Sequence, residues 1–516
     1  MKPFYSLCGA AFASLLSLTL VAPAFAQKVG DQKPETKAPM PAPQSLPTTP
    51  KVPLYKEGYQ FFGSFRARVE NQNFFPTDKA DGAYSFVGET LRLGISRQTK
   101  HEEMLFELSA PGLFNLPTQA NATAPQGALG QGANYRNENG GRVAGAFLKQ
   151  GYFRFKGLTG ATDSLKLGRF EFSDGAETVS TSGDASLLWL KQNRIAQRLI
   201  GPFNFTHIGR AFDGVQFGNA TPTRNSSIFA GFPTRGVFSL NGGDTLLQVR
   251  FAYAQTTVPI VTKSAPGEYR LFGIYYDDSR GKTTKTDNRP LAARQADRDT
   301  IKLVTGGGHY LRNFALGKNG GKLDTLLWGA GQFGTWGKLH HAAYAYDAEV
   351  GYQPKNAPAN LWLRAGFYYA SGDGSKANGS NNHSTFFPIL PTPRIYARYP
   401  FYSETNLQDA FVQAIIKPSA QWTLRADYHN LSLSNASDLW YSGGGAYDNA
   451  SFGYAGKPSG GFTSLANLFD LSVDYVASKS LTVSGYLAYA MGGSVVKTNY
   501  KSGDSVFAYL EATYKF

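Results

Sequence analysis

The sequence has a single cysteine, few charged residues and no long apolar run beyond its N-terminal segment. Cys8 is the only cysteine among 516 residues and lies inside the N-terminal apolar stretch, so the rest of the chain offers no disulfide or thiolate chemistry. Charged residues make up 17 % of the chain, against about a quarter in ordinary soluble proteins. After residue 26 no segment reaches the ~20 consecutive apolar residues of a spanning helix, so any membrane crossing must use strands.

The N-terminal residues have the pattern of an export signal. Lys2 supplies a positive start, Leu7 to Val21 an apolar run, and Ala24-Phe25-Ala26 a small-x-small cleavage site. This pattern predicts a signal peptide over residues 1–26. Residues 27–56 are rich in proline among polar residues and predict a disordered periplasmic tail, which leaves residues 57–516 for one folded domain.

Aromatic residues and glycine are abundant, although the chain as a whole is not hydrophobic. Aromatics reach 14 %, glycines number 57 and mean hydropathy is −0.29. The last twelve residues, SVFAYLEATYKF, alternate strictly between apolar and more polar positions and end on an aromatic. An apolar face with aromatic edges opposite a polar face is typical of a strand in a transmembrane β-barrel.

The same alternation recurs along the chain in runs of about ten residues separated by turn signals. This predicts an all-β fold, a transmembrane antiparallel up-and-down barrel of about eighteen strands. The expected strands are 58–70, 84–98, 102–110, 145–157, 163–172, 210–219, 224–232, 245–256, 268–277, 299–312, 323–336, 340–352, 359–371, 407–418, 421–434, 467–477, 480–491 and 504–516.

Short and long connections alternate between these strands, as short periplasmic turns and long outer loops do in outer-membrane barrels. Three connections break the rule: 257–267 and 313–322 are long for turns, and 337–339 is short for a loop. Eighteen strands would enclose a water-filled lumen. Because Leu187 to Leu190 is too apolar for a free loop, part of 173–209 is expected to fold into that lumen.

Alternation also predicts which side chains line the lumen. If Val249, Phe251 and Tyr253 face lipid, for example, Arg250 faces inward. Asp427 and His429 are also expected to face the lumen. The other acids expected there are Glu107, Asp347, Glu349, Asp470 and Asp474. The arginines expected inside by this rule are Arg66, Arg68, Arg92, Arg154, Arg250, Arg364 and Arg425.

An excess of inward arginine predicts an anion-selective pore, because a ring of guanidinium groups raises the local concentration of anions. Inward charges of both signs that merely solvate a wet lumen are the alternative. Alternation gives an improbable result at Glu89 and Arg169, because it places these charged side chains on the same side as their lipid-facing neighbours. Either a bulge shifts the register there or both side chains lie beyond the hydrocarbon.

Several motifs in order resemble the alginate export family of outer-membrane porins. They are the LGRFEFSDG stretch at 167–175, QRLIGPF at 197–203, GRAFDG at 209–214, LPTPR at 390–394 and YARYP at 396–400. The resemblance implies an 18-stranded monomeric barrel whose arginine-rich constriction passes a linear polyuronate. Matched by motif, Arg169, Arg210 and Asp213 are the implied constriction residues, and Arg154 is the next candidate.

The solute and its direction stay open at this stage. The favoured function is passive export of an anionic polysaccharide, and uptake of small organic anions is the alternative. The expected setting is the outer membrane of a Gram-negative bacterium, with lipid around a monomer and periplasmic export proteins as candidate partners. Export past the inner membrane argues against nucleic acid as a partner of this basic chain, whose formal net charge is +14.

An outer-membrane enzyme is the remaining alternative. No GxSxG elbow is present, and Asp427 and His429 have no evident nucleophile beside them. His340 and His341 are adjacent and lack the i+4 partner of a helical metal site. No catalytic residue, cofactor or metal is therefore expected.

Overall fold

The C-terminal strand closes a barrel against the first strand. In the computed structural model, β21 (Asp504–Lys515) pairs antiparallel with β1 (Tyr59–Asn73), with Val69 opposite Leu510. Leu510, Tyr514 and Phe516 are exposed on one side, while Phe507 and Tyr509 are buried on the other. The expected alternation is therefore present, and its apolar outer side faces away from the barrel interior.

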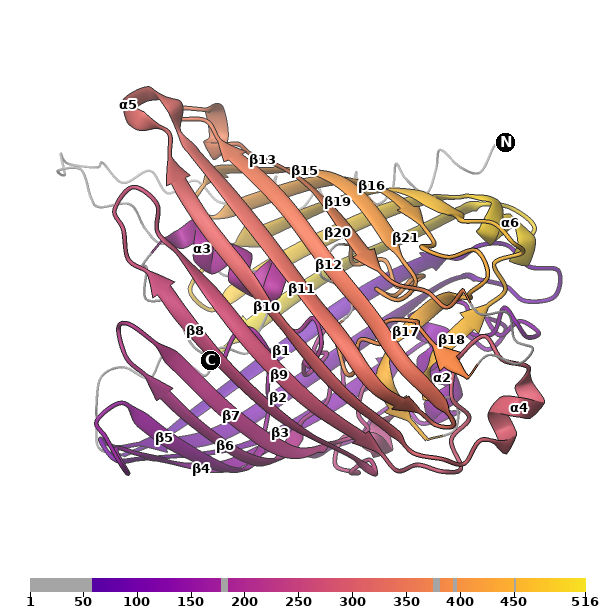
Figure 1. Cartoon of the computed structure of the whole chain (residues 1–516), viewed down its shortest axis with the longest axis horizontal. Helices are drawn as coiled ribbons and strands as arrows, with labels where there is room; N and C mark the ends of the chain where they lie inside the picture. The colour runs from indigo at the N-terminus through magenta and orange to yellow at the C-terminus, as the bar shows by residue number, and fades with distance from the viewer. Residues whose placement is uncertain (1–57, 178–183, 375–380, 393–396, 450–451) are drawn as a thin grey trace, which may run out of the picture. The chain divides into compact units, whose positions relative to one another are not determined.

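Eighteen long strands form the barrel, each paired antiparallel with its neighbours (Figure 1). All eighteen expected segments are confirmed, with ends shifted by a few residues. Between β1 and β21 the barrel strands are β2 (Ala83–Gln98), β3 (Glu102–Phe114), β4 (Phe147–Lys156), β5 (Asp163–Phe170), β6 (Phe212–Ala220), β7 (Asn225–Pro233), β8 (Val249–Ile260), β9 (Gly267–Asp278), β10 (Ile301–Ala315), β11 (Lys322–Trp336), β12 (Leu339–Gln353), β13 (Trp362–Ala370), β15 (Gln408–Ser419), β16 (Trp422–Ser432), β19 (Ser464–Val476) and β20 (Leu481–Gly492).

The connections divide the barrel into a short-turn end and a long-loop end. Two of the three expected exceptions shorten because β8 and β10 run further than the sequence pattern indicated, which leaves turns of 261–266 and 316–321. The third exception remains: the connection between β11 and β12, residues 337–338, is short although it lies at the long-loop end. The strict alternation expected of an up-and-down barrel is thus clearer in the structure than in the sequence.

The smaller elements lie in the connections. The long-loop end carries α2 (Gln131–Asn139), a 3₁₀ turn (Leu240–Gly242), α4 (Leu291–Ala296), α6 (Ser494–Asn499) and the hairpin of β17 (Trp440–Asp448) and β18 (Phe452–Lys457). The short-turn end carries α5 (Gly317–Gly320) and a 3₁₀ turn (Pro358–Asn360). The two-residue β14 (Asn382–His383) pairs parallel with β12.

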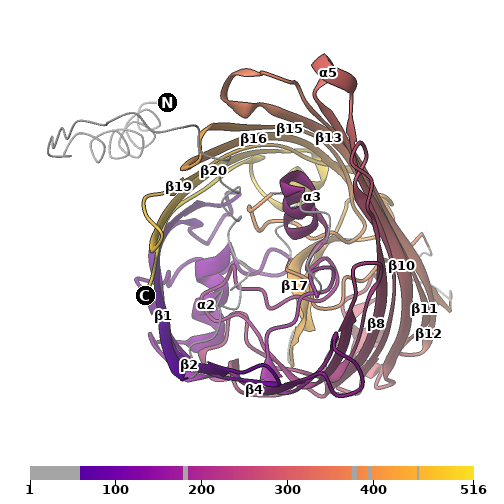
Figure 2. The same cartoon turned by 90° about the vertical axis from the view of Figure 1, so that its left-hand side faces the viewer.

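The lumen is occupied by chain as well as water-accessible space. Viewed along the barrel, α3 (Ala185–Leu190) lies inside the ring of strands (Figure 2). Leu187 and Leu190 are at most 1 % exposed, which confirms that the apolar part of this connection folds inward. The lumen that eighteen strands enclose is thus partly filled by this segment, as expected for part of 173–209.

The structure describes residues 58–177, 184–374, 381–392, 397–449 and 452–516. All of these belong to the unit Met40–Phe516. The signal peptide expected over 1–26, the tail expected over 27–56, and Arg394 and Tyr396 of the motifs lie outside the described residues. Within the described ranges, no helix is long and apolar enough to cross a membrane.

Candidate functional site: an arginine-bordered cavity in the lumen

The described part of the connection between β5 and β6, residues 171–177 and 184–211, is here called the inward segment. Its helix α3 begins at the N-cap Asp184, whose carboxylate accepts hydrogen bonds from the amides of Ser186 and Leu187. Trp189 of α3 packs edge to face on Trp362 of β13, with ring centroids 5.0 Å apart. A π-helical turn, Lys191–Ile195, continues α3 directly. Apolar packing against the inner wall therefore fixes the first half of the segment.

Arginines of the inward segment form ion pairs with carboxylates of the wall. Arg194 Nε lies 2.9 Å from a carboxylate oxygen of Glu349 on β12, and Arg198 pairs with Asp347 on the same strand. All four side chains are at most 2 % exposed. Charges buried this deeply must be paired, because a lone one would pay its full desolvation cost. The two acids expected to face the lumen therefore anchor the segment.

Arginines of the barrel wall donate hydrogen bonds to backbone carbonyls in the second half of the inward segment. Arg66 of β1 donates to the carbonyl oxygens of Asn204, at 2.6 Å, and Thr206, at 2.7 Å. Arg68 donates to the carbonyl of Phe205 at 2.6 Å and pairs with Glu70 at 2.8 Å. These carbonyls belong to irregular chain that no strand could pair, so the guanidinium groups satisfy them.

A cavity of about 130 Å³ lies between the inward segment and the strands β1, β15, β16, β19, β20 and β21. Its border is mixed in charge but favours cations. The carboxylates on it are Asp427, Asp470 and Glu511. The arginines on it are Arg66, Arg68, Arg194, Arg398 and Arg425.

Arg398 reaches this cavity from the connection between β13 and β15. It donates to the hydroxyl of Tyr509 at 2.6 Å, and among the described residues it forms no ion pair with a carboxylate. Burial opposes its charge, but the fields of Tyr509 and Asp474 outweigh burial and hold the pKa of Arg398 above its usual value. The guanidinium is thus a permanent cation that is not neutralised by a direct carboxylate partner.

One buried carboxyl of the inward segment is set apart from this network. Asp174 is fully buried, and one of its oxygens accepts hydrogen bonds from the amides of Leu199, at 3.3 Å, and Ile200, at 3.0 Å. Burial outweighs these bonds and raises the pKa of Asp174 to about 7. The fold of the inward segment is therefore linked to proton uptake at this residue.

The structure brings three of the sequence-predicted arginines, Arg66, Arg68 and Arg425, to the cavity. Three more of the predicted arginines also point into the lumen, but they do not border the cavity, and each lies beside a carboxylate. Arg92 contacts Glu171 at 3.1 Å, Arg154 contacts Glu103 at 3.0 Å, and Arg364 pairs with Asp324 and Glu349. The inward arginines thus serve largely to neutralise buried acids.

Arg169 and Asp213 lie elsewhere. The register of β5 on β6 is continuous and places them opposite each other, on the side shared by the exposed Val215 and Phe217. Arg169 Nε is 2.6 Å from Asp213 Oδ1 in a two-bonded pair near the long-loop end. The expected place in the lumen is therefore corrected: no bulge shifts this strand, and the pair lies outward at the rim. Glu89 likewise keeps its outward side without a bulge.

Arg250 also faces outward, contrary to the sequence expectation. Val249, Phe251 and Tyr253 are the inward side chains of β8, at most 3 % exposed, and Arg250 pairs with Asp277 on the outer side. Phe251 packs on Phe229 with ring centroids 5.0 Å apart. Lys302 of β10 likewise lies on the outer side, because Ile301 and Leu303 are buried inward. The apolar side of these strands contacts chain inside the barrel.

A bulge reverses the assignment at the start of β4. The pairing of β3 with β4 skips Lys149, so Phe147 and Lys149 are both buried, although unbroken alternation from the exposed Phe153 would place both outside. Lys149 donates to the carbonyls of Ile208 and Arg210. Bulges of this kind have no reliable local signal in the sequence.

Arg210 lies just before β6 and links loops. Its guanidinium donates to the carbonyl oxygens of Pro391, at 3.1 Å, and Gly444, at 2.7 Å.

The sequence analysis did not identify Arg194, Arg198 and Arg398 as lumen residues. An available signal was the presence of arginines directly after the apolar Leu187–Leu190 run, since an inward helix would bring them to the wall acids.

Comparison with known proteins agrees with this architecture. The model of the Alginate export family matches residues 146–508, more than half of the chain. No curated protein matches the chain.

Similar solved structures include three from Pseudomonas aeruginosa. They are the outer membrane protein opdK (10 % identity, covering 90 % of this chain and 100 % of that one, TM-score 0.50), OccK9 (OpdG) (13 %, 89 % and 98 %, 0.53) and OccK2 (OpdF) (11 %, 89 % and 98 %, 0.50). At these identities the similarity concerns the fold. With its closed eighteen-strand barrel and its family match, the chain is an outer-membrane channel that belongs to the Alginate export family.

Proposed function

We propose that this channel passes an anionic polysaccharide of the alginate-like polyuronate class outward across the outer membrane, down its concentration gradient. The observation that carries the proposal is Arg398, a guanidinium that forms no ion pair with a carboxylate among the described residues and lies on a luminal cavity bordered by four further arginines. Guanidinium binds carboxylate through two parallel hydrogen bonds and keeps its charge at every physiological pH, which suits a polymer with one carboxylate per sugar. The family match supports the same class of solute.

The proposed setting is the outer membrane of a Gram-negative bacterium, with the short-turn end in the periplasm. The channel works as a monomer surrounded by lipid, and periplasmic export proteins would deliver the polymer to the short-turn end. Since transport is passive, no cofactor and no catalytic residue takes part. The signal peptide and tail expected over residues 1–56 would bring the chain to this location.

The size of the cavity favours a second candidate. At about 130 Å³ it is smaller than the roughly 300–1,000 Å³ of typical small-molecule sites. A sugar chain would need a wider space than this cavity at the arginines, whereas a small organic anion needs less. Uptake of small organic anions is therefore the alternative function of the same arginine-bordered lumen.

Reversal potentials across a planar bilayer test the selectivity. Under a KCl gradient the wild-type channel should prefer chloride, and Arg398→Glu should shift the reversal potential toward cation preference because it reverses a charge that has no direct carboxylate partner. Arg224→Glu, in an exposed turn at the short-turn end, is the matched control. An equal shift in both variants, or none in Arg398→Glu, would contradict the proposed selectivity site.

The length of the solute separates the two candidates. Polyuronate chains added at the short-turn side should block the ion current at far lower concentrations than the uronate monomer, because successive carboxylates engage successive arginines. Equal block by monomer and polymer, at the same carboxylate concentration, would favour the small-anion channel.

A further inference from the structure

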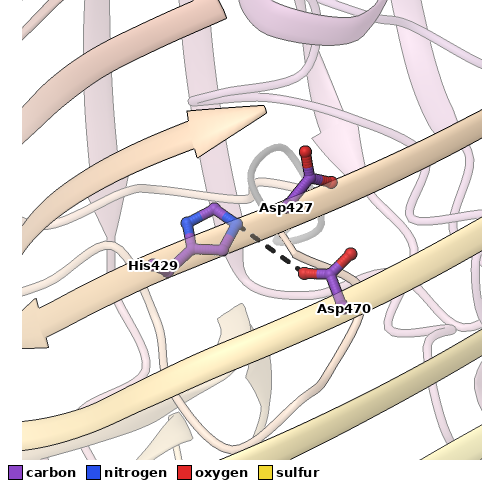
Figure 3. Close-up of side chains that lie close together, drawn as sticks. All are labelled: Asp427, His429 and Asp470. Atoms are coloured by element: carbon purple, nitrogen blue, oxygen red, sulfur yellow. Dashed lines mark ion pairs between the residues drawn. The ribbon is translucent and has the colours of Figure 1, made fainter. Parts of the chain in front are cut away.

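A histidine and three aspartates from three adjacent strands gather on the lumen wall. Asp427 and His429 of β16 alternate onto the inner side, and Asp470 of β19 is the direct cross-strand partner of Asp427. Figure 3 shows the three side chains converging from these two strands. Asp409 of β15 approaches His429 from the other side. His429, Asp409 and Asp470 are at most 4 % exposed.

The hydrogen bonds of His429 leave one ring nitrogen available. Its Nδ1 lies 3.0 Å from both carboxylate oxygens of Asp409, so an N–H at Nδ1 donates to that carboxylate. Its Nε2 is buried without a hydrogen-bond partner, because the nearest oxygen of Asp470 is 3.7 Å away, beyond hydrogen-bonding distance. In the neutral ring with its proton on Nδ1, the Nε2 lone pair is free to bind an ion together with Asp427 and Asp470.

The two aspartates carry matching unsatisfied atoms. Asp427 Oδ1 and Asp470 Oδ2 are also buried without hydrogen-bond partners. Buried polar atoms without partners are costly and call for a ligand that satisfies them together. Both aspartates border the luminal cavity, so a solute ion can reach these atoms from the pore.

We propose that Asp427, His429 and Asp470 bind a divalent transition-metal ion of the Zn²⁺ class. The candidate ligand atoms lie within 4.8 Å of one another. In a tetrahedral zinc site, bonds of about 2.0–2.2 Å place neighbouring ligand atoms about 3.4 Å apart, close to the 3.7 Å between His429 Nε2 and Asp470 Oδ2. Rotation of the Asp427 carboxylate closes the rest, and the fourth position stays open to the cavity.

Asp409 completes the arrangement as a positioning residue. A carboxylate on the far nitrogen of a ligating imidazole fixes the tautomer and strengthens the ligand, as in carboxylate–histidine–zinc units. The charges nearby are consistent with a bound cation. Of the five arginines on the cavity border, Arg425 pairs with Asp474, Arg194 with Glu349 and Arg68 with Glu70. Arg66 lies 3.8 Å from Glu511, and Arg398 forms no ion pair with a carboxylate among the described residues, so these two cations stand opposite the three clustered carboxylates Asp409, Asp427 and Asp470. A divalent ion would offset two of these negative charges.

Zinc binding to the full chain in detergent tests the proposal. After chelator treatment, equilibrium dialysis against micromolar Zn²⁺ with elemental analysis should give one ion per chain. His429→Gln and Asp470→Asn should weaken this binding at least 100-fold, and Asp409→Asn should weaken it about 10- to 100-fold. His101→Gln, in an exposed short turn, is the matched control and should bind as the wild type does.

The structure also contains a competing histidine pair that the test must separate. His341 and His383 meet through their Nδ1 atoms at 2.8 Å beside Trp336. X-ray absorption at the zinc edge of the wild-type protein should show one imidazole with oxygen ligands, and this measurement does not depend on a variant that folds. Two imidazoles in the shell, no zinc bound at micromolar concentration, or unchanged binding in His429→Gln would each overturn the proposed site.

Discussion

The ion pair between Arg198 and Asp347 should govern how often the inward segment leaves the lumen. Arg198→Met removes the one cationic side chain that pairs with Asp347 among the described residues and leaves that carboxylate buried, since neither side chain is more than 1 % exposed. Losing one partner of such a pair costs about 3–5 kcal/mol. Because about 1.4 kcal/mol corresponds to a tenfold change, the population with a displaced segment should rise by about 10²- to 4 × 10³-fold.

Single-channel recording measures this change directly. Arg198→Met should open more often and to a larger conductance than the wild type, because displacement exposes Asp347 to luminal water. The double variant Arg198→Met with Asp347→Asn should return toward wild-type gating, since removing both partners leaves no unpaired charge. Arg224→Met controls for the loss of an arginine. If Arg198→Met gates like this control, the ion pair does not hold the segment and the reasoning fails.

Three further predictions concern placement, steric fit and pH. Arg169→Gln should leave the reversal potential unchanged, because its guanidinium is paired on the outward side of the rim; a shift toward cations would return it to the pore. Gly88→Ala should increase proteolysis of the inward segment, because a Cβ there would lie 2.1 Å from the His207 ring, whereas Gly273→Ala meets nothing and serves as control. The segment should become more protease-sensitive as pH rises from about 4 through 7, since the pKa of Asp174 is raised from 3.8 to about 7 and the folded state holds a proton that the unfolded state has lost. Asp174→Asn should remove most of this pH dependence. If the variant keeps the wild-type pH dependence, a group other than Asp174 causes it.

The order and number of the strands follow from the sequence because their signals are local. Alternation with period two and the glycine- and proline-rich turns are properties of neighbouring residues, so all eighteen barrel strands could be located before any contact was known. The inward path of Leu187 to Leu190 was predictable for a similar reason, since so apolar a run gains little from an exposed loop.

Which side of a strand faces lipid was decided only in three dimensions. The alternation of β8 shows that Phe251 is apolar, but an apolar side chain gains as much from contact with Phe229 inside the barrel as from lipid outside. The sequence therefore mistook an inner apolar side for an outer one and reversed Arg250. Likewise the pairing of Arg198 with Asp347, and the meeting of Asp427 with Asp470, depend on register between distant segments. That register is fixed by closing the barrel and filling its lumen, and no local pattern encodes it.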